Sequence, residues 1–371
     1  MNRPSLLAVR TLIVLAVAAA AIGAITIASG MAPRPSSGPH VFPADAGSEC
    51  ISCHGIKELA VTLPSKEVLP LYVDPATIAS SVHGGKLECT DCHRDLISYP
   101  HPPRQFDDLR SFRISQYELC QRCHFANYTK TLDSVHFNKL SQGVSNSPVC
   151  TDCHGAHNIA PPDQPRSQVS KTCSACHGQV YETYVQSVHG AALAQDNNPD
   201  VPVCTDCHRV HDIQNPLTAE FRVQSVQLCS TCHNNKEMMS KYGISTQVTA
   251  TYLKSFHGMS VSLSGERGEK REIAEPVCTD CHGTHDIKNV SSAASPVIKE
   301  NLVATCQKCH PGASANFPTS WIGHYEPSLQ KEPAVFLVRW FYKLLIPFII
   351  GGLLVHILLD LWRVITNRER R

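Results

Sequence analysis

The stretch Cys150-Thr-Asp-Cys-His154 shows the pattern that decides this fold, because Cys-x-x-Cys-His recurs nine times along the chain. The nine copies use all 18 cysteines of the sequence. The cysteine pairs are Cys50/Cys53, Cys89/Cys92, Cys120/Cys123, Cys150/Cys153, Cys173/Cys176, Cys204/Cys207, Cys229/Cys232, Cys278/Cys281 and Cys306/Cys309. The histidines that follow them are His54, His93, His124, His154, His177, His208, His233, His282 and His310.

This spacing is the attachment motif of c-type haem. Two thiols about one helical turn apart form thioethers with one porphyrin, and the next histidine ligates its iron. Closed zinc sites combine two cysteine pairs, or one pair with distant histidines, and do not need an adjacent histidine each time. The chain has only 20 histidines in 371 residues, so nine adjacent ones are no coincidence. We therefore predict nine covalently bound haem c groups and a role in electron transfer.

Composition leaves little polypeptide for an ordinary core. Only 6% of the residues are aromatic, and nine porphyrins would share fewer than 300 residues. The haems must then form most of the core. We predict mainly short α-helices and loops packed around nine covalent haems, with little or no β-structure. The net charge of +1 gives no reason to expect nucleic-acid binding.

The motifs are organised as a repeat. The even-numbered motifs all read Cys-Thr-Asp-Cys-His, each preceded by a Ser-x-His segment and followed by a trailing histidine. We number the motifs 1 to 9 and define four di-haem units that start near Cys50, Cys120, Cys173 and Cys229, followed by a half unit at Cys306. A fixed period of this kind indicates stacked modules rather than one globule.

Histidine counting supplies candidates for the second axial ligand of every iron. Removing the nine proximal histidines, His40 in a linker and His356 in an apolar segment leaves nine of the 20. Bis-histidine ligation is therefore predicted throughout. A histidine three residues after a proximal one cannot reach the opposite face of the same porphyrin, so His157, His211 and His285 must reach neighbouring haems. The nine distal candidates are His83, His101, His136, His157, His189, His211, His257, His285 and His324.

Both ends of the chain have the composition of membrane segments. Residues 1–30 read as a signal peptide or a signal anchor, and residues 31–48 as a linker. Residues 49–328 form the predicted periplasmic nonahaem domain. Residues 329–371 form a C-terminal anchor, in which Leu344 to Trp362 is long enough to span a bilayer. The arginines after that span place the short tail in the cytoplasm and the haem domain on the periplasmic face of the inner membrane.

His356 lies near the middle of the C-terminal span, where an ionisable side chain is costly. Two functional readings are a quinone hydrogen bond and ligation of a haem b shared with another helix. The alternative is a packing contact with a partner helix, helped by Gly351 and Gly352.

The Cys-Thr-Asp-Cys-His and Ser-Val-His-Gly elements resemble multihaem c-type cytochromes of the doubled Cys-x-x-Cys-His family. Over about residues 50–324 the chain is similar to periplasmic cytochrome subunits of inner-membrane b/c quinone-oxidoreductase complexes. This resemblance implies a relay between quinol, through a cytochrome b partner, and periplasmic redox acceptors in anaerobic respiration. We expect an electron-transfer subunit rather than an enzyme on its own. The alternative is a reductase of nitrite, hydroxylamine or a sulfur oxyanion with one open haem.

Overall fold

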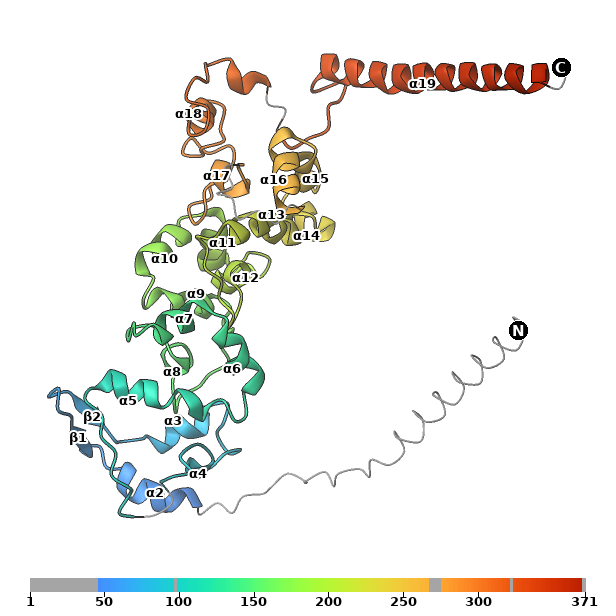
Figure 1. The fold of residues 1–371 in the computed structure, drawn as a ribbon. Coiled ribbons are helices and arrows are strands. Elements are labelled where there is room, and N and C mark those ends of the chain that lie inside the picture. Colours follow the sequence, from blue (N-terminus) through green and yellow to red (C-terminus); the bar gives the residue numbers. More distant parts are fainter. Residues whose placement is uncertain (1–45, 97–98, 267–274, 321–322, 369–371) are drawn as a thin grey trace, which may run out of the picture.

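The computed structural model describes residues 46–96, 99–266, 275–320 and 323–368. They form a mostly helical, elongated stack in which the elements follow one another in chain order (Figure 1). This agrees with the predicted repeat array of short helices. The helices are α2 (Ala46–His54), α3 (Pro75–Ser80), α4 (Cys89–Cys92), α5 (Leu109–Ser115), α6 (Phe125–Leu132), α7 (Val135–Ser141), α8 (Cys150–His154), α9 (Ser167–Ser174), α10 (Gly178–Val185), α11 (Val188–Asp196), α12 (Cys204–His208), α13 (Ala219–His233), α14 (Lys236–Ser240), α15 (Val248–Leu253), α16 (Phe256–Glu266), α17 (Cys278–His282), α18 (Leu302–Gln307) and α19 (Pro333–Arg368), with short 3-10 turns at Tyr117–Leu119 and Phe317–Ser320.

Within the described residues, β-structure is limited to one antiparallel hairpin in the first unit. Strands β1 (Ala60–Thr62) and β2 (Val68–Pro70) pair with Val61 opposite Leu69. The turn of the hairpin contacts the second unit, because the Ser65 backbone N–H donates to the Asp107 carbonyl at 3.0 Å. The prediction of little β-structure is confirmed.

In units two to four the Ser-x-His serine caps the start of a helix, whereas Ser81 of the first unit is the C-cap of α3 and accepts the His83 N–H at 3.1 Å. The hydroxyl of Ser187 accepts the Gly190 N–H at 3.1 Å, and that of Ser255 accepts the Gly258 N–H at 3.3 Å. A Cβ atom on Gly190 would lie 2.1 Å from the Tyr184 carbonyl oxygen, so glycine lets α11 pack tightly on α10. Capping and close packing fix the direction of the intervening histidine.

The aspartate of Cys-Thr-Asp-Cys-His also has a local explanation. Asp280 accepts the Val277 backbone N–H at 2.6 Å and so caps the short helix α17. It also pairs with Arg222 of α13, whose two terminal nitrogens lie 2.9 and 2.6 Å from the two carboxylate oxygens. Units two and three repeat this contact as Arg110–Asp152 and Arg166–Asp206. In each case the arginine precedes the odd motif and binds the even motif of the same unit.

The protein's own apolar core is thin. One cluster joins Val226, Tyr252, Val261 and Val277 in the fourth unit. Buried valines also precede the first cysteine of motifs 4 and 6, at Val149 and Val203. Such small clusters fit a fold in which bound cofactors, the predicted haems, would fill most of the interior.

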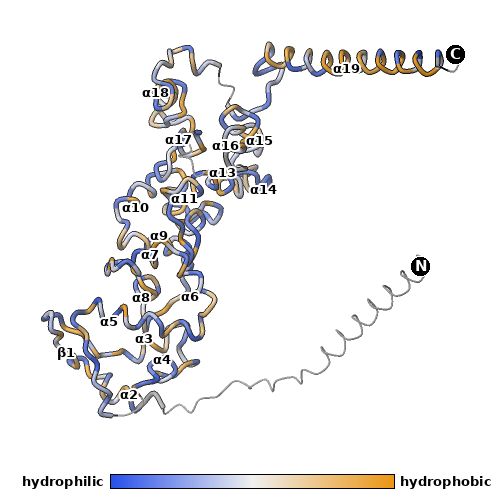
Figure 2. The backbone as a smooth tube through the Cα atoms, in the orientation of Figure 1, coloured by the Kyte–Doolittle hydropathy of each residue, from blue (hydrophilic) through white to orange (hydrophobic). Residues whose placement is uncertain are grey.

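Helix α19 is 36 residues long and carries a continuous apolar surface (Figure 2). By length and composition it could cross a membrane, and its most apolar stretch is not buried against the rest of the protein. The helix extends beyond the predicted span at both ends. The predicted N-terminal membrane segment lies outside the described residues, and the predicted domain boundaries stay predictions.

We expect Arg222→Gln to lower the stability of the fourth unit. The variant removes a two-pronged, charge-assisted contact to Asp280 whose side chains are about 30% exposed. The loss should be about 1 to 2 kcal/mol, seen as a thermal unfolding midpoint several degrees lower. Arg113→Gln is the matched control, because Arg113 lies 3.8 Å from Asp152 and is 58% exposed. An equal effect of both variants would contradict this role of Arg222.

Candidate haem-ligand pairs

Every proximal histidine lies opposite one of the nine distal candidates. The ring centroids of the partners are 6.0 to 6.4 Å apart, and each ring belongs to one such pair. The pairs are His54–His101, His93–His157, His124–His83, His154–His211, His177–His136, His208–His285, His233–His189, His282–His324 and His310–His257.

This separation fits two axial ligands on one iron. Two metal–nitrogen bonds of about 2 Å in line, plus about 1 Å from each nitrogen to its ring centre, place the centroids about 6 Å apart. Among the described residues no three histidine, cysteine or acidic side chains converge as a metal-ion site. A pair of imidazoles beside a Cys-x-x-Cys pair therefore suits a metal whose remaining donors come from a porphyrin. The ligation itself stays a prediction.

The pairs connect neighbouring units in both directions. The Ser-x-His histidine of one unit faces the odd proximal histidine of the next, as in His136–His177. The trailing histidine of that next unit faces the even proximal histidine of the unit before it, as in His211–His154. The rings of His157, His211 and His285 thus lie where the sequence analysis required them, beside the motif of the preceding unit.

A backbone hydrogen bond joins the two segments at each of the first three junctions between units. The residue between Ser and His donates its N–H to the isoleucine carbonyl two residues after the trailing histidine. These bonds are Val82–Ile159 at 2.8 Å, Val135–Ile213 at 2.8 Å and Val188–Ile287 at 2.9 Å. The bond holds the two distal histidines of a junction in a fixed relation.

His101 and His324 occupy the two ends of the array. In the first unit the trailing His101 faces His54 of the same unit. His324 comes from the half unit and faces His282 of the fourth. Their sequence contexts differ from the other trailing histidines because they serve the terminal positions.

Consecutive motifs also approach through their cysteines. Within each unit the first thiols of the odd and even motifs lie close enough for one to shift the pKa of the other. These pairs are Cys50–Cys89, Cys120–Cys150, Cys173–Cys204 and Cys229–Cys278. Between units, the second cysteine of the even motif interacts electrostatically with a cysteine of the next motif, as Cys92 with Cys120 and Cys281 with Cys306. The motifs are therefore neighbours in space in the order of the sequence.

The second cysteine of six motifs has an exposed side chain. The exposed cysteines in odd motifs are Cys53, Cys123, Cys176 and Cys309, and those in even motifs are Cys153 and Cys207. Their predicted role as thioether sites stays a prediction.

Helix ends explain the exposure of the four cysteines in odd motifs. Helices α9 and α18 stop two residues before Cys176 and Cys309, and Cys53 lies in the last turn of α2. Cys123 likewise follows the 3-10 turn that ends at Leu119. Side chains at such ends have few neighbours, since the apolar core of the protein is thin. The first cysteines are partly buried instead, because they contact the other motif of their unit.

Burial favours the neutral, metal-binding form of several of these imidazoles. Burial, and then the neighbouring His233, lowers the pKa of His189 to about 4. Burial, and then His324, lowers the pKa of His282 in the same way. The Nδ1 atom of His54 lies 2.7 Å from the Leu71 carbonyl oxygen, a contact that fixes the ring and leaves its other nitrogen for a ligand role.

Paired imidazoles beside repeated Cys-x-x-Cys motifs in a helical stack define a multihaem c-type cytochrome. Residues 144–234 match the family model described as cytochrome c3. The multihaem cytochrome MtrA of Shewanella baltica (strain OS185) is 24% identical over 153 residues, which are 41% of this chain and 34% of that protein. The matched region thus spans about a third of the relative's length. No solved structure matches the chain.

The sequence analysis missed the arginines that bind the Cys-Thr-Asp-Cys-His aspartates. Arg110, Arg166 and Arg222 precede motifs 3, 5 and 7 by seven to ten residues. The recurrence of an arginine at this position was the sequence signal that could have indicated the contact. In the first unit Asp91 accepts the cap N–H of Glu88 at 2.8 Å, as Asp280 accepts that of Val277.

Replacing a distal histidine should convert one iron from low-spin to high-spin. We expect His189→Ala to leave the iron at His233 with one protein ligand, because these two rings face each other. Electron paramagnetic resonance of the oxidised protein would show one high-spin centre per chain. His40→Ala is the control and should change nothing. An unaltered spectrum of the His189 variant would disprove the assignment.

Proposed function

We propose that the protein is a membrane-anchored relay of nine bis-histidine haems that passes electrons between the quinol pool and periplasmic redox acceptors. The soluble stack would lie on the periplasmic face of the inner membrane, with α19 crossing the bilayer. A cytochrome b or another quinol-oxidising membrane subunit would be its partner. The relay would serve anaerobic respiration.

The complete histidine pairing carries this proposal. Catalysis at haem needs an open axial position, whereas an electron relay works with both positions filled. Each of the nine proximal rings already faces a second imidazole, and the separations vary only from 6.0 to 6.4 Å. This supports a conduit over the alternative of a nitrite, hydroxylamine or sulfur-oxyanion reductase. Bis-histidine haems also favour low reduction potentials.

Continuity of the motifs supports a single path. Neighbouring first thiols of a unit, such as Cys173 and Cys204, would each become a thioether on a porphyrin edge. Two porphyrins in one unit would then approach at those edges. The contacts between units, such as Cys92 with Cys120, would extend the path to the next pair. Electrons could then pass along the stack from either end.

The membrane part of the proposal depends on α19. The helix has the length and apolarity of a span, and the described part of the chain contains one such helix. A single helix does not make a self-sufficient quinol-oxidising subunit, which favours a partner. His356, near the middle of the predicted span from Leu344 to Trp362, would contribute a quinone contact or a ligand to a shared haem b.

Quantitative electron paramagnetic resonance of the oxidised, detergent-purified protein tests the relay. We expect nine low-spin irons per chain, with the haem number fixed independently by the pyridine haemochrome assay. One high-spin iron in the unaltered protein would bring the reductase alternative forward, with His101 and His324 as the first ligands to re-examine.

Replacing His356 with Ala tests the quinol connection. In membranes that contain the partner, we expect the variant to lose quinol-driven haem reduction by tenfold or more, while dithionite still reduces every haem. Val355→Ala is the neighbouring control and should keep the unaltered rate. A normal rate in the His356 variant would assign α19 the role of a tether only.

A further inference from the structure

Helix α16 carries an apolar stripe that faces away from the protein. Phe256, Met259 and Leu263 are 84%, 44% and 54% exposed. Residues at this spacing share one side of an α-helix. The opposite side packs inward, where Val261 is 3% exposed and a Cβ atom on Gly258 would lie 2.2 Å from the Tyr252 carbonyl oxygen. We call these three exposed residues the α16 stripe.

The repeat shows that haem packing does not require this stripe. Counting from the Ser-x-His serine, the same three positions in the second unit are Val135, Asn138 and Gln142. In the third unit they are Val188, Ala191 and Gln195. The polar members of both sets are exposed to solvent. The polar positions therefore face solvent in the second and third units, and of these three units only the fourth has three large, exposed apolar side chains there.

The fourth unit is also the one connected to α19. Glu326, two residues after His324, lies 2.9 Å from the Lys254 ammonium and also binds Arg339 of α19. At this last junction the Lys254–Glu326 ion pair links the segments equivalent to those that a backbone hydrogen bond joins at the first three junctions. Lys254 is two residues before Phe256, so the α16 stripe and the first turns of α19 are held at the same end of the stack (Figure 1).

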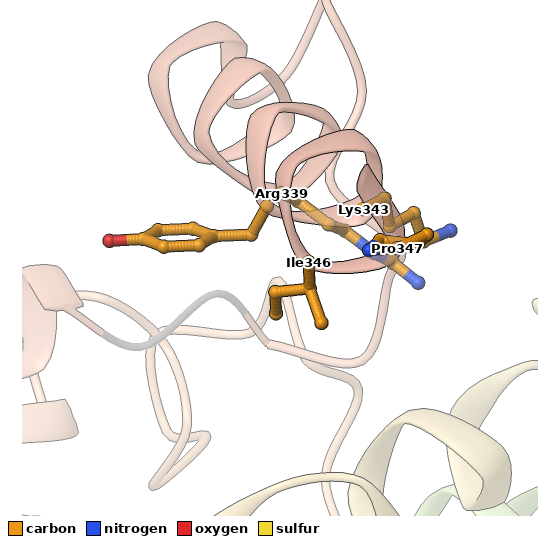
Figure 3. Close-up of a pocket in the computed structure, with 5 residues that line it drawn as sticks. Arg339, Lys343, Ile346 and Pro347 are labelled. Carbon is orange, nitrogen blue, oxygen red and sulfur yellow. The ribbon is translucent and has the colours of Figure 1, made fainter. Parts of the chain in front are cut away.

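The start of α19 has the side chains of a membrane interface. Arg339, Tyr342 and Lys343 line an open cavity of about 460 Å³ together with Ile346 and Pro347. Figure 3 shows the two cations projecting near these apolar side chains on α19. Cations beside aromatic and aliphatic groups suit the boundary between anionic headgroups and acyl chains. Lys254 adds a cation next to the α16 stripe.

We propose that the α16 stripe lies in the headgroup layer of the same bilayer that α19 crosses. The proposal rests on the proposed function only for the insertion of α19. The ligand candidate His257 directly follows Phe256 and faces His310. Contact between the stripe and lipid would therefore hold motif 9 at the membrane surface, where electrons from a membrane subunit would enter the array.

Depth measurement with a nitroxide label tests this placement. The haem-loaded full chain would carry the substitution Met259→Cys, and the label would react with this thiol because all other cysteines are used for haem attachment. The labelled protein would be inserted into vesicles of phosphatidylethanolamine and phosphatidylglycerol that contain no other protein. Asn138→Cys is the matched control at the equivalent position of the second unit. We expect the label at position 259 to be several-fold less accessible to a water-soluble nickel chelate and more accessible to oxygen than the label at 138.

Equal accessibility of the two labels would overturn the proposal, and Leu263→Cys repeats the comparison at a second stripe position. Burial of the label only in native membranes, not in protein-free vesicles, would also overturn it, since that result assigns the stripe to a protein partner. Label depth does not depend on electron transfer. A failure of quinol-driven reduction can therefore be distinguished from a failure of the lipid contact.

Discussion

The structure depends on one constraint, the pairing of two imidazoles about 6 Å apart with each ring drawn from a different part of the repeat. Eight of the nine pairs join a unit to its neighbour, and the pair His54–His101 closes the first unit on itself. Such a pair is stable only if something lies between the rings, since the gap is too wide for a hydrogen bond. Filling these gaps with the proposed haem irons would make metal binding and the stacking of units the same event. The thin apolar core is a consequence, because the polypeptide contributes few large buried side chains of its own.

Much of the site follows from the sequence because covalent haem attachment is a local property. Five consecutive residues, as in Cys204 to His208, carry the thiols and the proximal ligand in one short helix. The distal candidates were found by counting and by the repeated Ser-x-His context. Their pairing was beyond the sequence, because it depends on how the units stack. His83 and His124 are 41 positions apart, and no sequence feature near either residue indicates that the two rings face each other.

Other features were missed because they become apparent only when equivalent positions of different units are compared. The aspartate of Cys-Thr-Asp-Cys-His was visible, but its arginine partner lies 40 to 58 residues earlier. The α16 stripe reads as an ordinary helix face until it is set beside Asn138 and Gln142 of the second unit. In a repeat protein, the informative positions include those at which one unit departs from the others.

The exchange of distal histidines between neighbouring units also governs how an array of this kind can change in length. An inner unit receives ligands from both neighbours and gives one to each, so copying it would leave every proximal histidine with a partner. A cut between two inner units would strip a histidine from the odd motif on one side and from the even motif on the other. The ends differ from the interior, because His101 faces the odd motif of its own unit and His324 belongs to the half unit. Growth by internal duplication, with both termini kept, is therefore the route by which such a chain can gain haems.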